Sequence, residues 1–220
     1  MKRIVITMPE FITNEATYIE QFFEAGIDLL HLRKPDSCQE DCERLILQIN
    51  PKWYSKIVVH DHFELCEKYH LHGIHLNRRN HQIPEGFSGS ISRSCHSLEE
   101  VTDSKERFNY VFLSPIFDSI SKQGYQHAFT EEALSKAAQE GIIDEHVIAL
   151  GGISEDKIPQ IKAWRFGGAA FLGAVWNQCE THNAPCATHN APCATHNVPC
   201  ATHNVPCATH NAPCATHNAP

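Results

Sequence analysis

Residues 56–77 read KIVVHDHFELCEKYHLHGIHLN, a stretch that passes from one apolar run to another through a segment of different periodicity. The runs at 56–61 and 73–77 are short and rich in aliphatic residues, which is typical of buried strands. Residues 62–70 between them have the spacing of an amphipathic helix. Because a strand, a helix and a second strand in succession place the two strands parallel, this stretch predicts one unit of a parallel α/β sheet.

The same alternation continues on both sides of this stretch. It predicts eight strands, at 3–7, 27–33, 56–61, 73–77, 89–95, 110–115, 146–151 and 169–173. Helices are predicted at 14–25, 38–49, 62–70, 97–104, 130–139 and 155–164, and a loop at 77–89. No helix is predicted after the last strand, because residues 174–178 run directly into a repeat. Eight such units favour an α/β fold, a (βα)8 TIM barrel over residues 1–178, with a doubly wound open sheet as the alternative.

The composition indicates a soluble globular protein with one large core. The chain has 220 residues, of which 42% are hydrophobic and 20% are charged. Its net charge of −8 argues against nucleic acid as a partner, and no run approaches the roughly 18 apolar residues of a membrane span. The N-terminal MKRIVIT is too short for a signal peptide, so we expect a cytoplasmic protein that does not bind membranes. Free thiols are expected at the cysteines outside the repeat, which are Cys38, Cys42, Cys66 and Cys95.

Residues 179–220 are six copies of a heptapeptide that begins as CETHNAP and continues as CATHNAP or CATHNVP. A proline in every copy interrupts any helix, so a coiled coil is excluded and a disordered Cys/His repeat tail is expected. Each copy contains Cys-x-x-His, a pair of soft ligands suited to zinc, copper or nickel. A metal-sequestering role for this tail is therefore a separate hypothesis.

Polar, basic and hydroxyl side chains follow the predicted strands. In barrels of this type the ligand-binding and catalytic residues lie at the carboxyl ends of the strands. Arg78 and Arg79 occupy such positions after the fourth strand. The candidate site residues selected by this rule are His31, Arg33, His60, Asp61, Asn80, Ser94, Ser119, Ser121, Lys122, Gly151, Gly152 and Gly173.

Two kinds of anion site can be built from these residues. In SPIFDSISKQGY at 114–125, two serine hydroxyls and one lysine can converge on an oxyanion, although a polar surface loop would look similar. In ALGGISE at 149–155 and RFGGAAFLGA at 165–174, glycines at strand ends let backbone N–H groups approach a phosphate, although tight turns also use glycine. Barrels often bind phosphate between the loops after strands seven and eight, so the glycine pair is the stronger candidate.

Seven segments occur in order between residues 3 and 177: LLHLRK, IVVHDHFELC, GIHLN, SRSCHSLEE, YVFLSPIFDSISKQGY, VIALGGI and GGAAFLGAV. Together they resemble the family that comprises the thiamine-phosphate synthases and the thiazole tautomerases (TenI-like proteins). The resemblance implies a TIM barrel. It also implies, for a synthase, the joining of hydroxymethylpyrimidine diphosphate to thiazole phosphate, with magnesium and cationic side chains on the departing pyrophosphate.

The resemblance assigns a role to each matching residue. Arg33 and Lys122 would hold the pyrophosphate together with Ser119 and Ser121, and Ser94 would lie near the reacting groups. Gly152 and Gly173 would bind the thiazole phosphate. Asp61 would be a magnesium ligand.

Four positions depart from the family pattern. His31 replaces a glutamine, His60 replaces an asparagine, and Pro35 replaces a lysine for which Lys34 is expected to compensate. The second magnesium carboxylate is replaced by Asn80. Because a neutral amide is a poorer ligand for a hard divalent cation than a carboxylate, Mg2+ is expected to bind weakly or not at all.

These features rank a thiamine-phosphate synthase-like transferase first. A thiazole tautomerase ranks second, because Pro115 stands where such enzymes carry a histidine, although His31, His60, His62 or His96 could supply the titrating group. A non-catalytic binder of thiazole or thiamine phosphate ranks third, and small phosphorylated molecules are the expected partners of all three. Without a last helix, the first and eighth strands would expose an apolar flank, which predicts reduced stability, a homodimer formed through that flank, or a tail that packs there as irregular chain.

Overall fold

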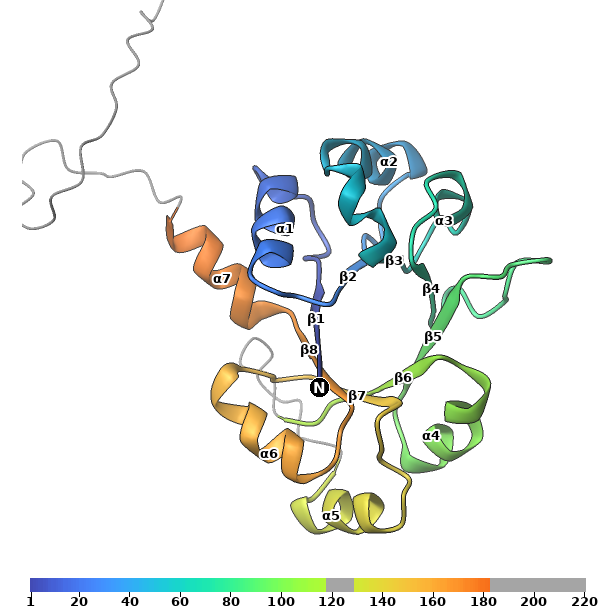
Figure 1. Cartoon of the computed structure of the whole chain (residues 1–220), viewed down its shortest axis with the longest axis vertical. Helices are drawn as coiled ribbons and strands as arrows, with labels where there is room; N and C mark the ends of the chain where they lie inside the picture. The colour runs from blue at the N-terminus through green and yellow to red at the C-terminus, as the bar shows by residue number, and fades with distance from the viewer. Residues whose placement is uncertain (118–128, 183–220) are drawn as a thin grey trace, which may run out of the picture. The chain divides into compact units, whose positions relative to one another are not determined.

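Eight parallel strands close into a barrel in the order of the chain (Figure 1). The computed structural model describes residues 1–117 and 129–182. The ring is closed by pairing of the first and last strands, in which Lys2 is level with Gly168, so the doubly wound open sheet is excluded. The strands are β1 (Lys2–Ile6), β2 (Leu29–Leu32), β3 (Ile57–Val59), β4 (Gly73–Leu76), β5 (Ser90–Cys95), β6 (Tyr110–Leu113), β7 (Val147–Leu150) and β8 (Gly168–Phe171).

Seven α-helices of the described residues surround the barrel (Figure 1). They are α1 (Glu15–Glu24), α2 (Gln39–Gln48), α3 (Glu64–Lys68), α4 (Leu98–Ser104), α5 (Glu131–Gln139), α6 (Ile158–Ala163) and α7 (Gly173–His182). Short 3-10 helices are η1 (Pro51–Lys56), η2 (Lys105–Arg107) and η3 (Glu155–Lys157). In the described part of the chain no helix has both the length and the apolar character needed to cross a membrane.

Side-chain caps show why two of these helices begin where they do. The Ser97 hydroxyl accepts a hydrogen bond from the backbone N–H of Glu100, whose carboxylate accepts one from the backbone N–H of His96 (2.7 Å). Thr130 caps α5 in the same way through the N–H of Ala133 (3.2 Å). These caps satisfy N–H groups that the first turn of a helix leaves without carbonyl partners.

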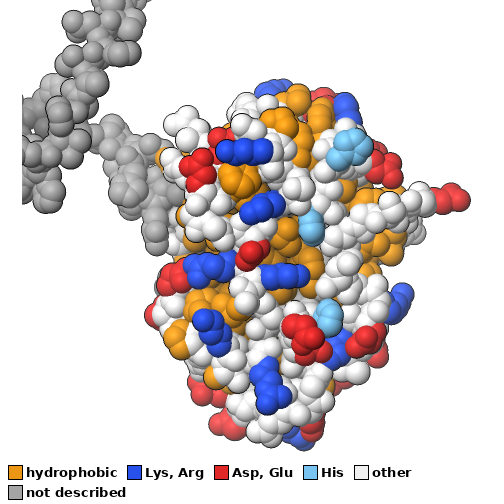
Figure 2. All heavy atoms as spheres, in the orientation of Figure 1, with side chains coloured by type: hydrophobic (Ala, Val, Ile, Leu, Met, Phe, Trp, Pro, Cys, Tyr) orange, Lys and Arg blue, Asp and Glu red, His pale blue; other side chains and the backbone are white. Residues whose placement is uncertain are grey.

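The side chains of each strand point alternately inward and outward, which divides the hydrophobic core into one part inside the barrel and another between the barrel and the helices. Ile4 and Ile6 of β1 point into the barrel with Tyr110 and Phe112 of β6, whereas Val5 points outward to the helices. Successive side chains of a strand face opposite sides, which produces this division. Figure 2 shows one face of the molecule, on which hydrophobic side chains are interspersed with charged side chains of both signs, near the centre as well as along the rim. Cys42, Cys66 and Cys95 are buried and Cys38 is exposed; all four are free thiols, as predicted.

The prediction that no helix follows the last strand is wrong, because α7 begins at Gly173 and extends into the first copy of the repeat (Figure 1). The first proline of the repeat is Pro185, which lies beyond the end of the helix. The Trp176 side chain is fully buried, donates a hydrogen bond to the Ile6 carbonyl (2.7 Å) and contacts the edge of the Phe22 ring. The flank on which the dimer expectation rested is therefore covered, and the repeat from residue 183 onward lies outside the described residues.

Candidate active site

The carboxyl ends of the strands bring most of the predicted site residues to one end of the barrel, its mouth. Arg33 follows β2, Asp61 follows β3, Asn80 follows β4 and Gly152 follows β7. Ser119, Ser121 and Lys122 lie outside the described residues. Their assignment to the diphosphate of a substrate therefore stays a prediction.

Arg79 and Asn80 both contact the Asp61 carboxylate. The guanidinium of Arg79 lies 3.0 and 3.2 Å from its two oxygens, and the amide nitrogen of Asn80 lies 2.7 Å from one of them. The Asn80 amide also donates to the His60 carbonyl (3.0 Å). The only carboxylate of this group is thus neutralised by a guanidinium, and these residues do not fit a magnesium site built on two carboxylates.

Arg33 is held at the mouth by β1. Its backbone N–H donates to the Thr7 hydroxyl (2.9 Å), and that hydroxyl donates to the Arg33 carbonyl (3.1 Å). Burial lowers the pKa of the half-buried guanidinium and nearby Arg79 lowers it further, while Asp61 and Asp36 raise it. Arg33 is therefore a cation beside the ion pair of Arg79 with Asp61, and an anionic ligand would stabilise its charge.

Lys34 does not compensate for the lysine replaced by Pro35. Its side chain is buried, and its ammonium donates to both Glu15 carboxylate oxygens (2.7 and 2.8 Å) and to the Glu10 carbonyl (2.7 Å). Burial raises the pKa of Glu15 and lowers that of Lys34, and the contact between them opposes both shifts. This ion pair fastens α1 to the end of β2 and leaves no charge for a ligand.

A chain of hydrogen bonds links the polar side chains of the barrel interior. His31 lies between His60 (Nδ1 to Nε2, 2.8 Å) and the Tyr110 hydroxyl (2.7 Å from Nε2). The chain continues through the hydrogen bond between Tyr110 and Ser92 to the His75 ring (2.8 Å). From there it reaches Ser94.

Ser94 lies at the end of this chain nearest the mouth. Its hydroxyl is 2.9 Å from Nε2 of His75, whose Nδ1 faces Ser92. Burial lowers the pKa of His75 to about 3 and lowers those of His31 and His60 well below the usual value, so all three rings are neutral at pH 7. One nitrogen of each imidazole lies within 4.8 Å of the others, a spacing that could suit a metal ion. The ring nitrogens, however, form hydrogen bonds with each other or with hydroxyls.

The turn after β7 requires its glycines. Gly151 and Gly152 have φ values of 98° and 63°, a region that side chains other than glycine rarely adopt. A Cβ atom on Gly151 would lie 2.9 Å from the Cα of Pro115, and the Gly151 carbonyl accepts a hydrogen bond from Phe117 (3.1 Å). Gly173 starts α7; the N–H groups of Val175 and Trp176 donate to the Leu172 carbonyl (3.2 and 3.3 Å), so those of Gly173 and Ala174 are the ones that could face a ligand. The turns after β7 and β8 thus offer backbone donors to an anion.

Sequence reasoning overlooked Thr7, Tyr110, Ser92 and the pairing of Arg79 with Asp61. Tyr110 and Ser92 lie within strands, where hydroxyl-bearing residues resemble ordinary core or surface positions. Arg79 was recognised as a residue that follows the fourth strand, but the sequence gives no sign that it would contact Asp61. The partners of Lys34 are likewise distant in the sequence.

The closed barrel and the cationic and glycine-rich mouth define a (βα)8-barrel enzyme. A family model described as "TMP-TENI: Thiamine monophosphate synthase" matches residues 4–175. The chain belongs to this family, and the resemblance inferred from its motifs is confirmed.

Curated relatives and solved structures agree with this assignment. A crystal structure of thiamine phosphate pyrophosphorylase from Bacteroides thetaiotaomicron shares 44% identity and superposes with a TM-score of 0.75, covering 86% of this chain and 90% of that one. Curated thiamine-phosphate synthases of Proteus mirabilis and Bacteroides thetaiotaomicron are 25% and 26% identical. They match 74% and 76% of this chain and 80% and 88% of their own lengths.

Proposed function

We propose that the protein is a thiamine-phosphate synthase, a transferase that joins hydroxymethylpyrimidine diphosphate to thiazole phosphate. The observation that supports this proposal is that two groups of candidate anion-binding residues lie on opposite sides of one barrel mouth. Arg33 follows β2 and Arg79 follows β4, and each of these strands is three places around the ring from β7, which Gly152 follows. A reaction between two phosphorylated substrates needs such an arrangement, since each phosphate is held apart while the reacting rings meet between them.

The residues of the mouth can be assigned to this reaction. The bond between the pyrimidine methylene and its diphosphate oxygen breaks with both electrons leaving on pyrophosphate, and the thiazole nitrogen forms the new bond to the methylene carbon. Arg33 and Arg79 stabilise the negative charge of the leaving group, assisted by Ser119, Ser121 and Lys122. Ser94, oriented by His75, borders the reacting rings, and the backbone N–H groups near Gly151, Gly152 and Gly173 bind the thiazole phosphate.

His31 and His60 position rather than touch the substrates in this proposal. His31 has no exposed surface and His60 is 4% exposed, so they act through their hydrogen bonds to the interior chain. Magnesium has no assigned role in this proposal, since the residues around Asp61 do not fit a site built on two carboxylates. Because Arg79 occupies both Asp61 oxygens, no step of the proposed mechanism depends on the metal.

Replacement of Arg33 by alanine tests the assignment of the diphosphate site. We expect kcat/KM for the pyrimidine diphosphate to fall by roughly 100-fold or more, since a positioned charge on the leaving group is lost, while KM for thiazole phosphate stays unchanged. The measurement is the formation of thiamine phosphate at varied concentrations of each substrate. Arg44→Ala is the matched control, because Arg44 pairs with Asp41 on α2. An equal loss in both variants, or a change confined to KM for thiazole phosphate, would contradict the assignment.

A further inference from the structure

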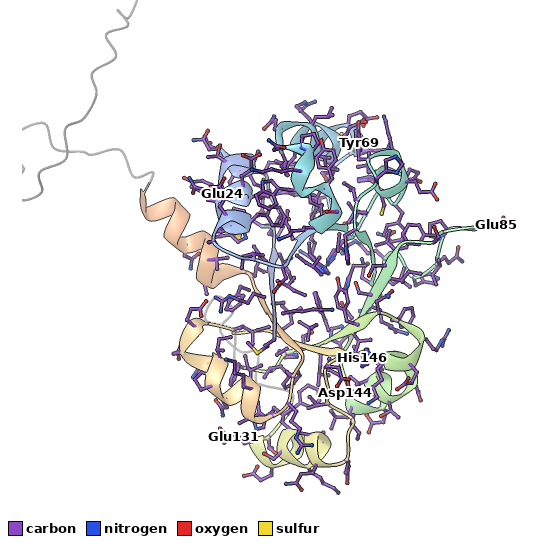
Figure 3. All side chains as sticks on the ribbon, viewed as in Figure 1. Glu24, Tyr69, Glu85, Glu131, Asp144 and His146 are labelled. Carbon is purple, nitrogen blue, oxygen red and sulfur yellow. The ribbon has the colours of Figure 1, made fainter. Side chains whose placement is uncertain are left out.

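The hydrogen-bond chain inside the barrel is shielded from water. Figure 3 shows side chains filling the space that the strands enclose. His31 and His75 have no exposed surface, and Ser92 and Tyr110 are each 1% exposed. Buried polar groups are matched donor to acceptor, because an unmatched group loses its hydrogen bond to water without replacement. The hydrogen atoms of this chain are therefore arranged so that each contact has one donor and one acceptor.

His75 allows only two arrangements of these hydrogen atoms. Its Nδ1 lies 2.8 Å from the Ser92 hydroxyl oxygen, and its Nε2 lies 2.9 Å from that of Ser94. Burial lowers the pKa of His75 to about 3, so the ring is neutral and carries hydrogen on one nitrogen only. One serine therefore accepts a hydrogen bond from His75, and the other donates one to it. The choice decides whether Ser94 presents a hydrogen atom or lone pairs to the mouth.

Tyr110 favours one of the two arrangements. Its hydroxyl lies 2.7 Å from Nε2 of His31 and also bonds to Ser92, but it has a single hydrogen atom to donate. A phenol is a stronger donor than an alcohol, and an imidazole nitrogen is a stronger acceptor than a hydroxyl oxygen, so Tyr110 donates to His31. His31 in turn donates from Nδ1 to His60. The Tyr110 oxygen is left to accept from Ser92.

The hydroxyl of Ser92 therefore directs its hydrogen atom away from His75. The backbone carbonyl of Ile74, which can only accept, lies 3.4 Å from the same hydroxyl and favours the same direction. Ser92 then accepts from the Nδ1–H of His75. Nε2 of His75 is bare as a result, and it accepts from the Ser94 hydroxyl.

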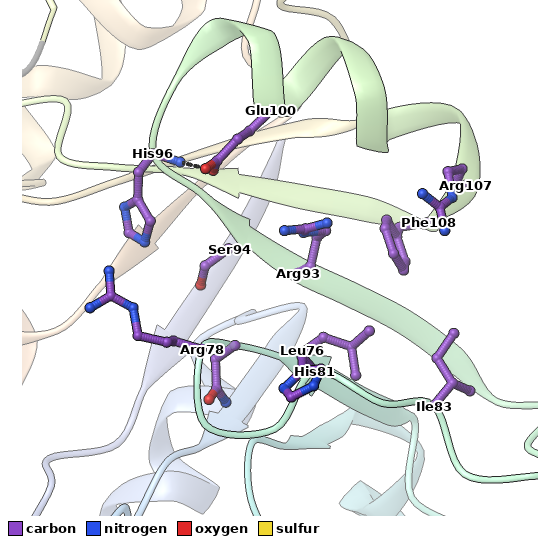
Figure 4. Close-up of a pocket in the computed structure, with 11 residues that line it drawn as sticks. Leu76, Arg78, His81, Ile83, Arg93, Ser94, His96, Glu100, Arg107 and Phe108 are labelled. Carbon is purple, nitrogen blue, oxygen red and sulfur yellow. Dashed lines mark hydrogen bonds between the residues drawn. The ribbon is translucent and has the colours of Figure 1, made fainter.

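We propose that Tyr110 is a positioning residue that fixes the Ser94 hydroxyl as a hydrogen-bond acceptor at the mouth. Ser94 borders a cavity of about 440 Å³ that Arg78 also lines (Figure 4), so its remaining lone pairs are available to a ligand there. An acceptor selects a ligand with an N–H or NH2 group over one with a bare ring nitrogen or a carbonyl at the same place. Together with the proposed function, on which this step rests, Ser94 is assigned to the amino group of the pyrimidine ring.

Nitrogen-15 NMR of the unchanged protein tests the arrangement of the hydrogen atoms without a ligand. The chemical shifts of the two imidazole nitrogens distinguish the one that carries hydrogen from the bare one. We expect His31 and His75 to carry hydrogen on Nδ1, although a free neutral imidazole side chain favours Nε2. Tyr110→Phe removes only the hydroxyl and is expected to shift His75 toward the Nε2–H form. Tyr54→Phe is the matched control, because the Tyr54 hydroxyl bonds to the Ile46 carbonyl on α2.

Binding of two diphosphates tests the consequence at the mouth. One is hydroxymethylpyrimidine diphosphate, and the other carries hydrogen in place of the ring amino group. The unchanged protein is expected to bind the first about tenfold more tightly, as one additional hydrogen bond would provide. Ser94→Ala is expected to lose this preference and Tyr110→Phe to reduce it. Because Tyr110 acts through Ser94, the double variant Ser94→Ala/Tyr110→Phe is expected to show the same preference as Ser94→Ala.

Melting temperatures of all variants separate a change at the mouth from a loss of the fold. The role of Tyr110 is overturned if His75 carries hydrogen on Nε2 in the unchanged protein, or if Tyr110→Phe changes neither this tautomer nor the preference. It is equally overturned if Tyr110→Phe alters the preference in the absence of the Ser94 hydroxyl. If no pyrimidine diphosphate binds, the proposed function fails, while the NMR result still decides the arrangement of the hydrogen atoms.

Discussion

Acidification from pH 6.5 to pH 4 is expected to unfold this protein, because His31 and His75 are buried as neutral rings. Burial lowers the pKa of His75 to about 3 and that of His31 well below its usual value. Below pH 6.5 the unfolded chain takes up protons that the folded protein cannot, so stability is present above this pH and is lost as the pH falls. Burial lowers the pKa of His60 in the same way, so the three rings, at about 1.4 kcal/mol per pH unit each, lower the free energy of unfolding by roughly 4 kcal/mol per unit.

Denaturant unfolding at pH 7, 6 and 5 measures this dependence. His31→Gln keeps a side chain able to hydrogen-bond with His60 and Tyr110 but removes one of the three titrating groups, so the slope below pH 6 is expected to fall by about a third. His81→Gln changes an exposed histidine and is expected to leave the slope as it is. A slope that is the same in His31→Gln and in the unchanged protein would show that the interior histidines do not govern acid stability.

Lys34→Met is expected to destabilise the protein by about 3 kcal/mol or more, although the new side chain has a similar length. The substitution leaves the Glu15 carboxylate, which is 3% exposed, without its cation, and it removes the donor to the Glu10 carbonyl. Breaking a buried ion pair from one side costs about 3–5 kcal/mol, because the remaining charge stays buried or must take up a proton. Burial raises the pKa of Glu15, so proton uptake by the unpaired carboxylate would limit the loss.

The double variant Lys34→Met/Glu15→Leu separates the value of the ion pair from the cost of an unpaired charge. Replacing both partners by apolar side chains is expected to recover most of the stability lost in the single variant. The free energy of unfolding of the four proteins, measured at pH 7, gives the coupling between the two residues. If Lys34→Met alone is as stable as the unchanged protein, the pair is not buried as described.

Most of the strands could be predicted because they are short apolar runs that end in polar residues, whereas β5, with the sequence SISRSC, is largely polar. Ile57–Val59 and Gly73–Leu76 are completely buried, so their sequences carry a strong signal with little ambiguity. The last helix could not be predicted, because GAVWNQCETH at 173–182 has a weak amphipathic pattern and enters a repeat whose later copies contain proline. Its stability comes from Trp176, which packs on β1 and α1 from far away in the sequence.

The mouth residues could be located by the rule that sites follow parallel strands, but their contacts could not. Arg33 and Lys34 are neighbours in the sequence, yet one faces the mouth and the other is buried against Glu15. The direction of such side chains depends on the helix that packs beside them. The interior hydrogen-bond chain through Tyr110 joins strands that are separated in the sequence, and no local pattern reveals that its members meet.

The most direct test of the proposed synthase activity is turnover by the full chain with hydroxymethylpyrimidine diphosphate and thiazole phosphate. The reaction is followed with and without added Mg2+, and both products are quantified. We expect thiamine phosphate and pyrophosphate to form in equal amounts only when both substrates are present, with activity that persists in part without the metal because Arg33 and Arg79 supply charge to the leaving group. Absence of thiamine phosphate under all these conditions, with thiazole phosphate still bound, would contradict the synthase assignment.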